Sequence, residues 1–334
     1  MKFFVCLYSF LLILSACQVN KTGFPEIETT VDSLAAIGNY TDAIKILEKA
    51  KLQYLEHNYE IVKNLALLYG KIDNFEESFK LWNEGHNKGY FFGLFSHFPI
   101  YQPYKEFSQF NSICEKDMQL RKDSLVNSKT TYEIISPKNF NPQLKYPLLI
   151  VLHGGGSSIK KEKGYWKSEI LTNNFIVAFA QSYLYYDMIT FGWKINDDRA
   201  RNDLRKCYDE ILENFLIDTS KVIIGGISAG AYTAIDISIN KFFPTTGFFA
   251  ICPDVTADDF EIETIRNAKL SGIRGVIISG ENDFALSNQK QLFKKFNAVD
   301  FHYIFEIVSG TGHEYPNDFE NKIDAACNFI LNNI

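Results

Sequence analysis

The sequence predicts an α/β fold with a mostly parallel sheet, preceded by a small all-α region. From residue 130 onward, short continuous apolar runs alternate with stretches of helical periodicity. This alternation favours a parallel sheet covered by helices on both faces. Residues 28–125 instead carry a helical repeat. A chain of 334 residues is long enough for a sizeable core and an accessory unit.

The expected elements of the α/β part follow from these patterns. Strands are expected at 131–135, 147–152, 175–180, 222–226, 247–251, 275–279 and 303–308. Helices are expected at 199–214, 229–240, 288–296 and 317–332. The domain boundary is expected near 124–129, which gives a helical domain over 28–125 and an α/β domain over 130–334.

Composition and charge narrow the possible ligands. The net charge of −6 provides no basic surface, so nucleic acid is not an expected partner. No metal-type cysteine spacing and no G-x-G-x-x-G loop is present, so neither a metal nor another cofactor is expected. Four cysteines remain after position 17, and they are read as free thiols with one bridge as the alternative: Cys114, Cys207, Cys252 and Cys327.

The first residues have the composition of an export signal. Lys2 precedes an apolar stretch over 3–14, which is too short to span a bilayer as a mature helix. The stretch ends in Leu14-Ser15-Ala16-Cys17, which resembles the lipobox of bacterial lipoproteins. The resemblance implies cleavage of residues 1–16, lipidation of Cys17 and membrane anchoring in the bacterial cell envelope, facing the periplasm or exterior. An ordinary secretory signal and a cytoplasmic protein are the alternatives.

The helical part repeats with a period of 35 residues. Gly38, Tyr40, Ala43, Leu47 and Ala50 correspond to Asp73, Phe75, Ser78, Trp82 and Gly85. The period resembles the 34-residue tetratricopeptide repeat, and a further helix is expected at 104–125. The region is interpreted as a helical layer that packs on the following domain, with a groove for a protein partner as the alternative.

The most specific motif lies within residues 221–236. The apolar run Val222, Ile223 and Ile224 leads into Gly226-Ile227-Ser228-Ala229-Gly230, a G-x-S-x-G, and helical spacing follows. A strand that reverses directly into a helix holds its central Ser in a strained conformation and requires small neighbours. The motif therefore predicts a nucleophile elbow at Ser228.

Other polar residues also follow predicted strands. His153-Gly154-Gly155-Gly156 follows the strand at 147–152, Asp283 follows 275–279, and His313 follows 303–308. Ligands of parallel sheets bind at the carboxyl ends of the strands, so these residues are expected near Ser228.

Together, HGGG, GISAG, GEND and GTGH resemble the α/β-hydrolase serine esterases over 130–334. The similar branches are the phospholipase/carboxylesterase and poly(3-hydroxybutyrate) depolymerase-like enzymes, next to prolyl-oligopeptidase-like domains. The resemblance implies an α/β-hydrolase fold in which Ser228 attacks a small or polymeric ester and His313 is the base. Asp283 would orient His313. The backbone N–H groups of Ala229 and of Gly155 or Gly154 would form the oxyanion hole.

Several alternatives stay open. Asp254 is a second candidate for the acid, and His153 is interpreted as structural. In the loop 181–198, Tyr186 and Trp193 are candidate pocket residues, although ordinary packing explains aromatic residues equally well. The competing functions are a prolyl-oligopeptidase-like peptidase and a non-catalytic tetratricopeptide scaffold.

Overall fold

A computed structural model describes residues 23–95 and 97–331. The contacts divide the chain into two compact units, Met1–Lys88 and Gly89–Ile334. The predicted signal and Cys17 lie outside the described residues. Among the described residues, no helix has both the length and the apolar character needed to cross a membrane.

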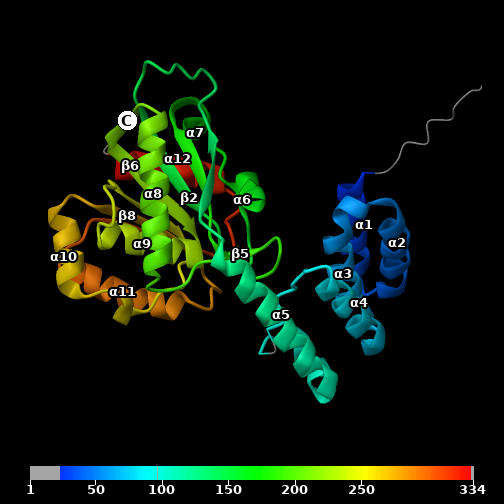
Figure 1. The fold of residues 1–334 in the computed structure, drawn as a ribbon. Coiled ribbons are helices and arrows are strands. Elements are labelled where there is room, and N and C mark those ends of the chain that lie inside the picture. Colours follow the sequence, from blue (N-terminus) through cyan, green and yellow to red (C-terminus); the bar gives the residue numbers. More distant parts are fainter. Residues whose placement is uncertain (1–22, 96, 332–334) are drawn as a thin grey trace, which may run out of the picture. The chain divides into compact units, whose positions relative to one another are not determined.

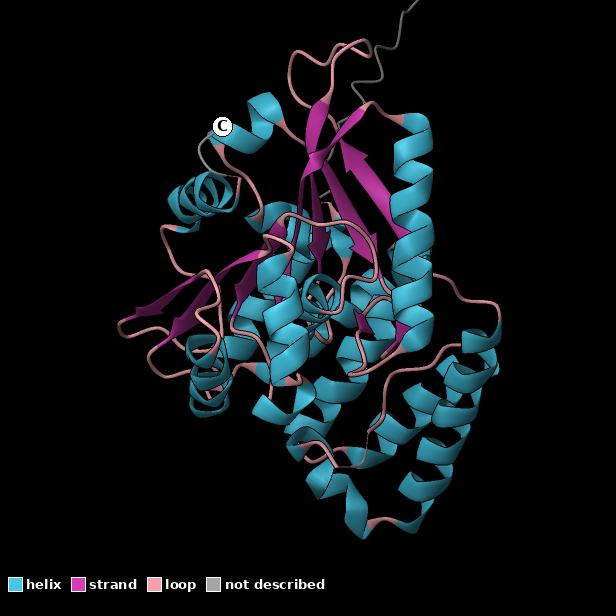
Figure 2. Ribbon diagram, turned by 90° about the vertical axis from the view of Figure 1, so that its left-hand side faces the viewer, coloured by secondary structure: helices cyan, strands magenta, loops and turns pink. Residues whose placement is uncertain are grey.

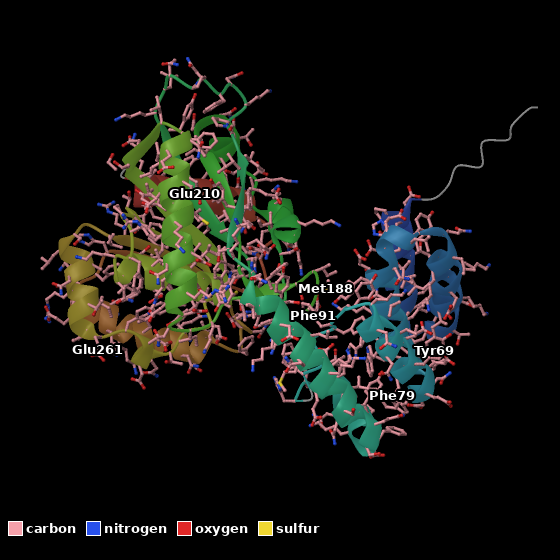
Figure 3. All side chains as sticks on the ribbon, viewed as in Figure 1. Tyr69, Phe79, Phe91, Met188, Glu210 and Glu261 are labelled. Carbon is pink, nitrogen blue, oxygen red and sulfur yellow. The ribbon has the colours of Figure 1, made fainter. Side chains whose placement is uncertain are left out.

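The first unit consists of two helical hairpins. Helices α1 (Phe24–Ala36) and α2 (Tyr40–Gln53) form one hairpin. The short 3₁₀ helix η1 (Leu55–His57) then leads into α3 (Asn58–Lys71) and α4 (Phe75–Asn87), which form the other. Figure 3 labels Tyr69 on α3 and Phe79 on α4.

The 35-residue sequence repeat corresponds to these two hairpins. Asn39 and Asn74 occupy equivalent positions, and each side chain accepts a hydrogen bond from a backbone N–H in the first turn of the following helix. Leu47 and Trp82, also equivalent, are both buried. Each repeat thus begins its second helix with the same cap and buries the same face.

The division between the units differs from the expected boundary. Helix α5 (Ser108–Val126) belongs to the second unit and not to the helical prefix. The Asp117 carboxylate in α5 accepts hydrogen bonds from the backbone N–H groups of Phe92 (2.6 Å) and Leu94 (3.0 Å). These bonds tie α5 to the segment just after Lys88. The expected helix at 104–125 is also shorter, because a 3₁₀ helix η2 (Pro99–Glu106) ends at Phe107 in an extended conformation.

The second unit contains a seven-stranded sheet. Its strands are β1 (Thr131–Ile135), β2 (Tyr146–Leu152), β3 (Ile176–Gln181), β6 (Ile217–Ile227), β7 (Gly247–Ile251), β8 (Arg274–Gly280) and β9 (Tyr303–Val308). Their order is β1-β3-β2-β6-β7-β8-β9. Strand β1 pairs antiparallel with β3, and the other neighbours pair parallel. Each expected strand is present, with bounds shifted by a few residues in β2, β3, β6 and β8.

Helices cover both faces of this sheet (Figures 1 and 2). One face packs against α8 (Asp198–Asn214), α9 (Ala229–Ile239), α10 (Ile262–Leu270) and α11 (Leu286–Ala298). The other face packs against α6 (Ile159–Tyr165), α7 (Glu169–Asn174) and α12 (Phe319–Ile330). Strand β2 shows the division, because Leu148, Ile150 and Leu152 join the first core whereas Leu149 and Val151 join the second.

The sequence analysis did not identify three of these helices. Helices α6 and α7 are only 7 and 6 residues long, so neither shows a full helical period. Helix α10 has 9 residues and is also short. Two further elements, β4 (Leu184–Tyr185) and β5 (Phe191–Gly192), pair with each other inside the loop after β3.

Helix α9, which follows Ser228, is anchored by a buried ion pair. The Arg201 guanidinium of α8 donates two hydrogen bonds to Asp236 of α9, at 2.8 and 2.9 Å. Both side chains are largely shielded from solvent, so removal of either partner would leave the other charge buried without its main counterion. The pair fixes the elbow helix against the helix beside it.

We predict that Gly230→Ala lowers the free energy of unfolding by more than about 2 kcal/mol. A Cβ at residue 230 would lie 2.4 Å from the His153 carbonyl oxygen and 2.5 Å from that of Leu152, and neither backbone atom can move away cheaply. The matched control is Gly164→Ala in α6, where a Cβ would meet no heavy atom within 4 Å. Denaturant unfolding should separate the two variants. Equal stability would contradict the close approach of α9 to the end of β2.

Candidate active site

Ser228 lies on the turn between β6 and α9, in a conformation that few residues adopt. Its φ is 55° and its ψ is −120°. The turn is held in place because the Ser228 N–H donates to the Ile251 carbonyl (2.9 Å) and the Ser228 carbonyl accepts from the Tyr232 N–H (2.9 Å). These two bonds use only the main chain of Ser228, so they fix where its side chain is attached and do not involve its hydroxyl.

Two glycines make this turn possible. A Cβ at Gly226 would lie 2.5 Å from the Leu152 carbonyl oxygen and 2.8 Å from the carbonyl carbon of Gly230. Any side chain at Gly230 would collide with the end of β2. The G-x-S-x-G pattern thus reflects the close contact of β2, β6 and α9.

His313 and Asp283 form a hydrogen-bonded pair. Asp283 follows β8, and His313 follows the neighbouring strand β9. The Nδ1 atom of His313 lies 2.9 Å from Oδ1 of Asp283. Because the carboxylate can only accept, it selects the tautomer with the proton on Nδ1 and leaves Nε2 as the acceptor. The exposed ring of Phe284 stacks on His313 at 4.4 Å between centroids.

Asp283 is itself fixed by two further donors. The Ala285 N–H donates to Oδ1 (2.9 Å), and Nε2 of the buried Gln289 in α11 donates to Oδ2 (3.1 Å). The alternative acid Asp254 is exposed, and its backbone N–H lies 3.5 Å from the Ser228 carbonyl oxygen. Of the two candidates, Asp283 makes the hydrogen bond with His313.

The turn after β2 is supported by His153. This side chain is fully buried, its Nδ1 lies 2.7 Å from the Gly154 carbonyl oxygen, and its Nε2 accepts from the Ser182 N–H (3.1 Å). Burial lowers the pKa of His153 to about 4, although the bond to Gly154 opposes this shift. His153 is therefore neutral and structural. Trp193 supports the same turn, because its indole N–H donates to the His153 carbonyl (2.9 Å).

The N–H groups of this turn have different partners. That of Gly156 donates to the Phe191 carbonyl (2.8 Å). The Gly154 backbone lies close enough to the Glu162 carboxylate to lower its pKa, so Gly155 is favoured over Gly154 as the candidate oxyanion donor. Ala229 is the first residue of α9, and the first N–H groups of a helix have no partner within it. Gly155 and Ala229 are the two candidate donors.

Ser228 and His313 open into one pocket of about 220 Å³. Its walls come from the turn after β2, from α6 and from the loop that carries His313. The described lining residues are Gly154, Gly155, Ser157, Lys161, Glu162, Tyr165, Ile227, Ser228, His313, Glu314 and Tyr315.

The two aromatic candidates from the sequence lie outside this lining. Trp193 is buried beneath the turn. Tyr186 lies beside the turn, with its hydroxyl 3.3 Å from where a Cβ of Gly155 would be. The aromatic residues of the pocket are instead Tyr165 and Tyr315, whose rings stack at 4.4 Å.

Cys252 lies beside the His313–Asp283 pair. The potential ligand atoms of these three side chains lie within 4.8 Å of one another. Among the described residues, this spacing is short enough for all three to contact one metal ion. However, burial raises the pKa of the Cys252 thiol to about 12, so the thiol stays protonated near neutral pH. The chemistry of this set fits a hydrogen-bonded histidine and carboxylate better than a metal site.

Sequence reasoning missed Glu162, Tyr315 and Gln289. Tyr315 is two residues from His313, and this proximity was a usable signal. Glu162 and Gln289 lie on helices with no motif of their own, and they meet the site only through the fold.

Comparisons with known proteins agree with this architecture. An uncharacterized protein from Bacillus cereus ATCC 10987 superposes with a TM-score of 0.52 at 21% identity, over 92% of this chain and 99% of that chain. A ferulic acid esterase gives 0.51 at 16% identity, over 62% and 94%. A probable dipeptidyl-peptidase 5 from Aspergillus clavatus is 28% identical over 109 residues, which is 30% of this chain but only 15% of that protein. No protein-family model matches.

The expectation for the fold is confirmed. The second unit has the α/β-hydrolase fold, with a mostly parallel sheet covered by helices on both faces, and a helical region precedes it.

We predict that Asp283→Asn lowers the turnover of any substrate that Ser228 attacks by about 10³- to 10⁴-fold. The amide could present its N–H₂ to His313 and so select the wrong tautomer. Asp254→Asn is the matched control and should remain near the wild-type rate, because that side chain is exposed. Steady-state kinetics of both variants checks this. A larger loss in Asp254→Asn would move the acid to the end of β7.

Proposed function

We propose that this protein is a serine hydrolase that cleaves carboxylic esters. The observation that carries the proposal is the strained Ser228 in the same pocket as His313, whose other nitrogen is held by Asp283. A serine held in a strained backbone conformation costs folding energy, and such strain clusters at functional sites. A non-catalytic scaffold would need neither the strain nor the oriented imidazole.

The proposed reaction has two halves. The Ser228 oxygen bonds to the acyl carbon while its proton passes to Nε2 of His313, and the oxyanion accepts hydrogen bonds from the N–H groups of Gly155 and Ala229. When the ester C–O bond breaks, His313 gives that proton to the leaving alcohol. Water then attacks the acyl-enzyme by the same route and releases the acid. Asp283 stays ionised and stabilises the imidazolium.

The pocket size favours short acyl groups. Pockets for drug-sized ligands usually measure about 300–1,000 Å³, whereas this one measures about 220 Å³. Two stacked tyrosine rings and Ile227 provide its apolar surface. We therefore propose a small acyl group on an alcohol that extends into solvent, which a polymer chain could also supply.

A peptidase is the second candidate, and the partial match to a probable dipeptidyl-peptidase 5 favours it. The same nucleophile and base would serve both reactions, because acyl transfer to Ser228 precedes release of either an alcohol or an amine. Parallel assays with an ester and an amide of the same acyl group distinguish the two.

We predict that Ser228→Ala abolishes hydrolysis of p-nitrophenyl acetate and labelling by a fluorophosphonate probe. Loss of a triad nucleophile typically reduces turnover by about 10⁶-fold. The control is Ser220→Ala, an exposed serine on the same strand β6, which should behave as wild type. Thermal unfolding of each variant verifies folding. Ester hydrolysis that persists in Ser228→Ala would refute the proposed nucleophile.

We also propose that the two hairpins are tetratricopeptide-type repeats that bind a protein partner. Support for the repeats comes from the 35-residue period and the matching caps.

We further propose that Cys17 anchors the protein to a membrane in the bacterial cell envelope. Support for the anchor comes from the apolar stretch at 3–14 and the small residues before Cys17.

For the anchor, we predict that Cys17→Ser moves the protein from the membrane fraction to the soluble fraction or leaves the signal uncleaved. The control is Cys6→Ser, which changes a thiol inside the segment that would be removed. Membrane fractionation and intact mass report both effects. An unchanged mass and distribution in Cys17→Ser would contradict lipidation.

A further inference from the structure

Glu162 is a buried acid beside the proposed nucleophile that the reaction does not use. It belongs to the short helix α6, its side chain is 2% exposed, and it lines the same pocket as Ser228 and His313. A buried carboxylate is costly unless donors compensate for the lost water. The hydrogen-bond partners of Glu162 therefore indicate its role in the pocket.

Those partners come from both sides of the pocket. On one side, the Ser157 hydroxyl donates to Oε1 (2.7 Å), and the nearby Gly154 backbone lowers the pKa of the same carboxyl group. On the other side, the Tyr315 hydroxyl donates to Oε2 (2.5 Å). Gly154 and Ser157 flank the oxyanion donor Gly155, and Tyr315 is two residues after His313.

The direction of the bond between Tyr315 and Glu162 is set by Trp166. Its indole N–H can only donate, and it donates to the Tyr315 oxygen (2.9 Å). The single proton of Tyr315 is then left for Glu162. Stacking of Tyr315 with Tyr165 and its contact with Phe319 hold the ring in place. Oε2 of Glu162 thus accepts from Tyr315, and Oε1 lies 2.7 Å from the Ser157 hydroxyl, which can donate to it.

Burial raises the pKa of Glu162, whereas its bonds to Tyr315, Ser157 and Gly154 and the nearby charge of Lys161 lower it. The carboxylate is kept in this apolar position by donors that belong to the oxyanion turn and to the histidine loop.

We propose that Glu162 is a positioning residue that fixes the oxyanion turn relative to the loop that carries His313. The inference rests on the proposed ester hydrolysis, because it assigns a role in the same site. Ser157 and Gly154 lie on either side of Gly155 in the chain, so the bond from Ser157 to Glu162 restrains the segment that carries the Gly155 N–H. A lost acceptor would let both segments relax, and small displacements of oxyanion donors reduce transition-state stabilisation more than substrate binding.

The test compares Glu162→Gln with Glu169→Gln, the same substitution at an exposed glutamate on α7. With p-nitrophenyl acetate, Glu162→Gln should lower kcat by about 10- to 100-fold and change KM by less than about 2-fold, as expected when an oxyanion donor is displaced. Fluorophosphonate labelling should slow by a similar factor. Glu169→Gln should match wild type in each measurement.

A second variant covers the case in which Glu162→Gln does not fold. Tyr315→Phe keeps the ring and its stacking but removes the donor to Glu162, so it should also lower kcat without raising KM. Where both fold, the double variant should lose less than the product of the two single losses, because both break the same connection. Wild-type kcat in a folded single variant, or a rise in KM alone, would overturn the role of Glu162. Absence of both labelling and hydrolysis in the wild-type protein would instead refute the proposed function.

Discussion

The contact between the end of β2 and the start of α9 is the constraint on which the rest of the site depends. Gly230 and Gly226 allow backbone to meet backbone, with the Leu152 carbonyl oxygen 2.5 Å from where a Cβ of either would be. This contact places the first residue of α9 beside the turn that follows β2. Main-chain packing therefore brings the two candidate oxyanion donors, Ala229 and Gly155, to the same end of the sheet, and the side chains beneath and beside the turn hold it there.

Two buried carboxylates, Asp283 and Glu162, then hold the His313 side chain and the loop that carries it. Asp283 accepts from His313, from the Ala285 N–H and from Gln289, so it holds the imidazole from behind. Glu162 accepts from Ser157 and Tyr315, so it connects the histidine loop to the opposite wall of the pocket. Both carboxylates are surrounded by donors, but only Asp283 contacts the proposed base, His313. The two proposed roles, orienting the base and positioning the oxyanion donors, therefore fall to different carboxylates.

The sequence was sufficient for the features that arise from local patterns. Strands β1, β7 and β9 have the expected bounds because apolar runs bounded by turn residues define them. Ser228, Asp283 and His313 could be named as candidates because each lies in the loop that follows a predicted strand. Glu162 could not, since its bond to Tyr315 joins residues 153 positions apart. The assignment of α5 to the second unit depends on the buried Asp117, and nothing in the pattern of α5 reveals that its carboxylate binds backbone N–H groups before the helix.

The loop 181–198 shows how the fold uses an aromatic residue beside the site. Trp193 was a candidate pocket residue with ordinary packing as the alternative, and in the structure its indole N–H donates to the His153 carbonyl beneath the turn. An aromatic residue with a polar hydrogen is well suited to such a place, because the ring fills the core while the N–H satisfies a buried carbonyl. Tyr315 has the same dual character at the pocket wall, where its ring stacks on Tyr165 and its hydroxyl links Trp166 to Glu162. Trp193 therefore supports the backbone beneath the site and Tyr315 forms part of its wall, and the space beside Ser228 that remains between the turn after β2 and the histidine loop is about 220 Å³.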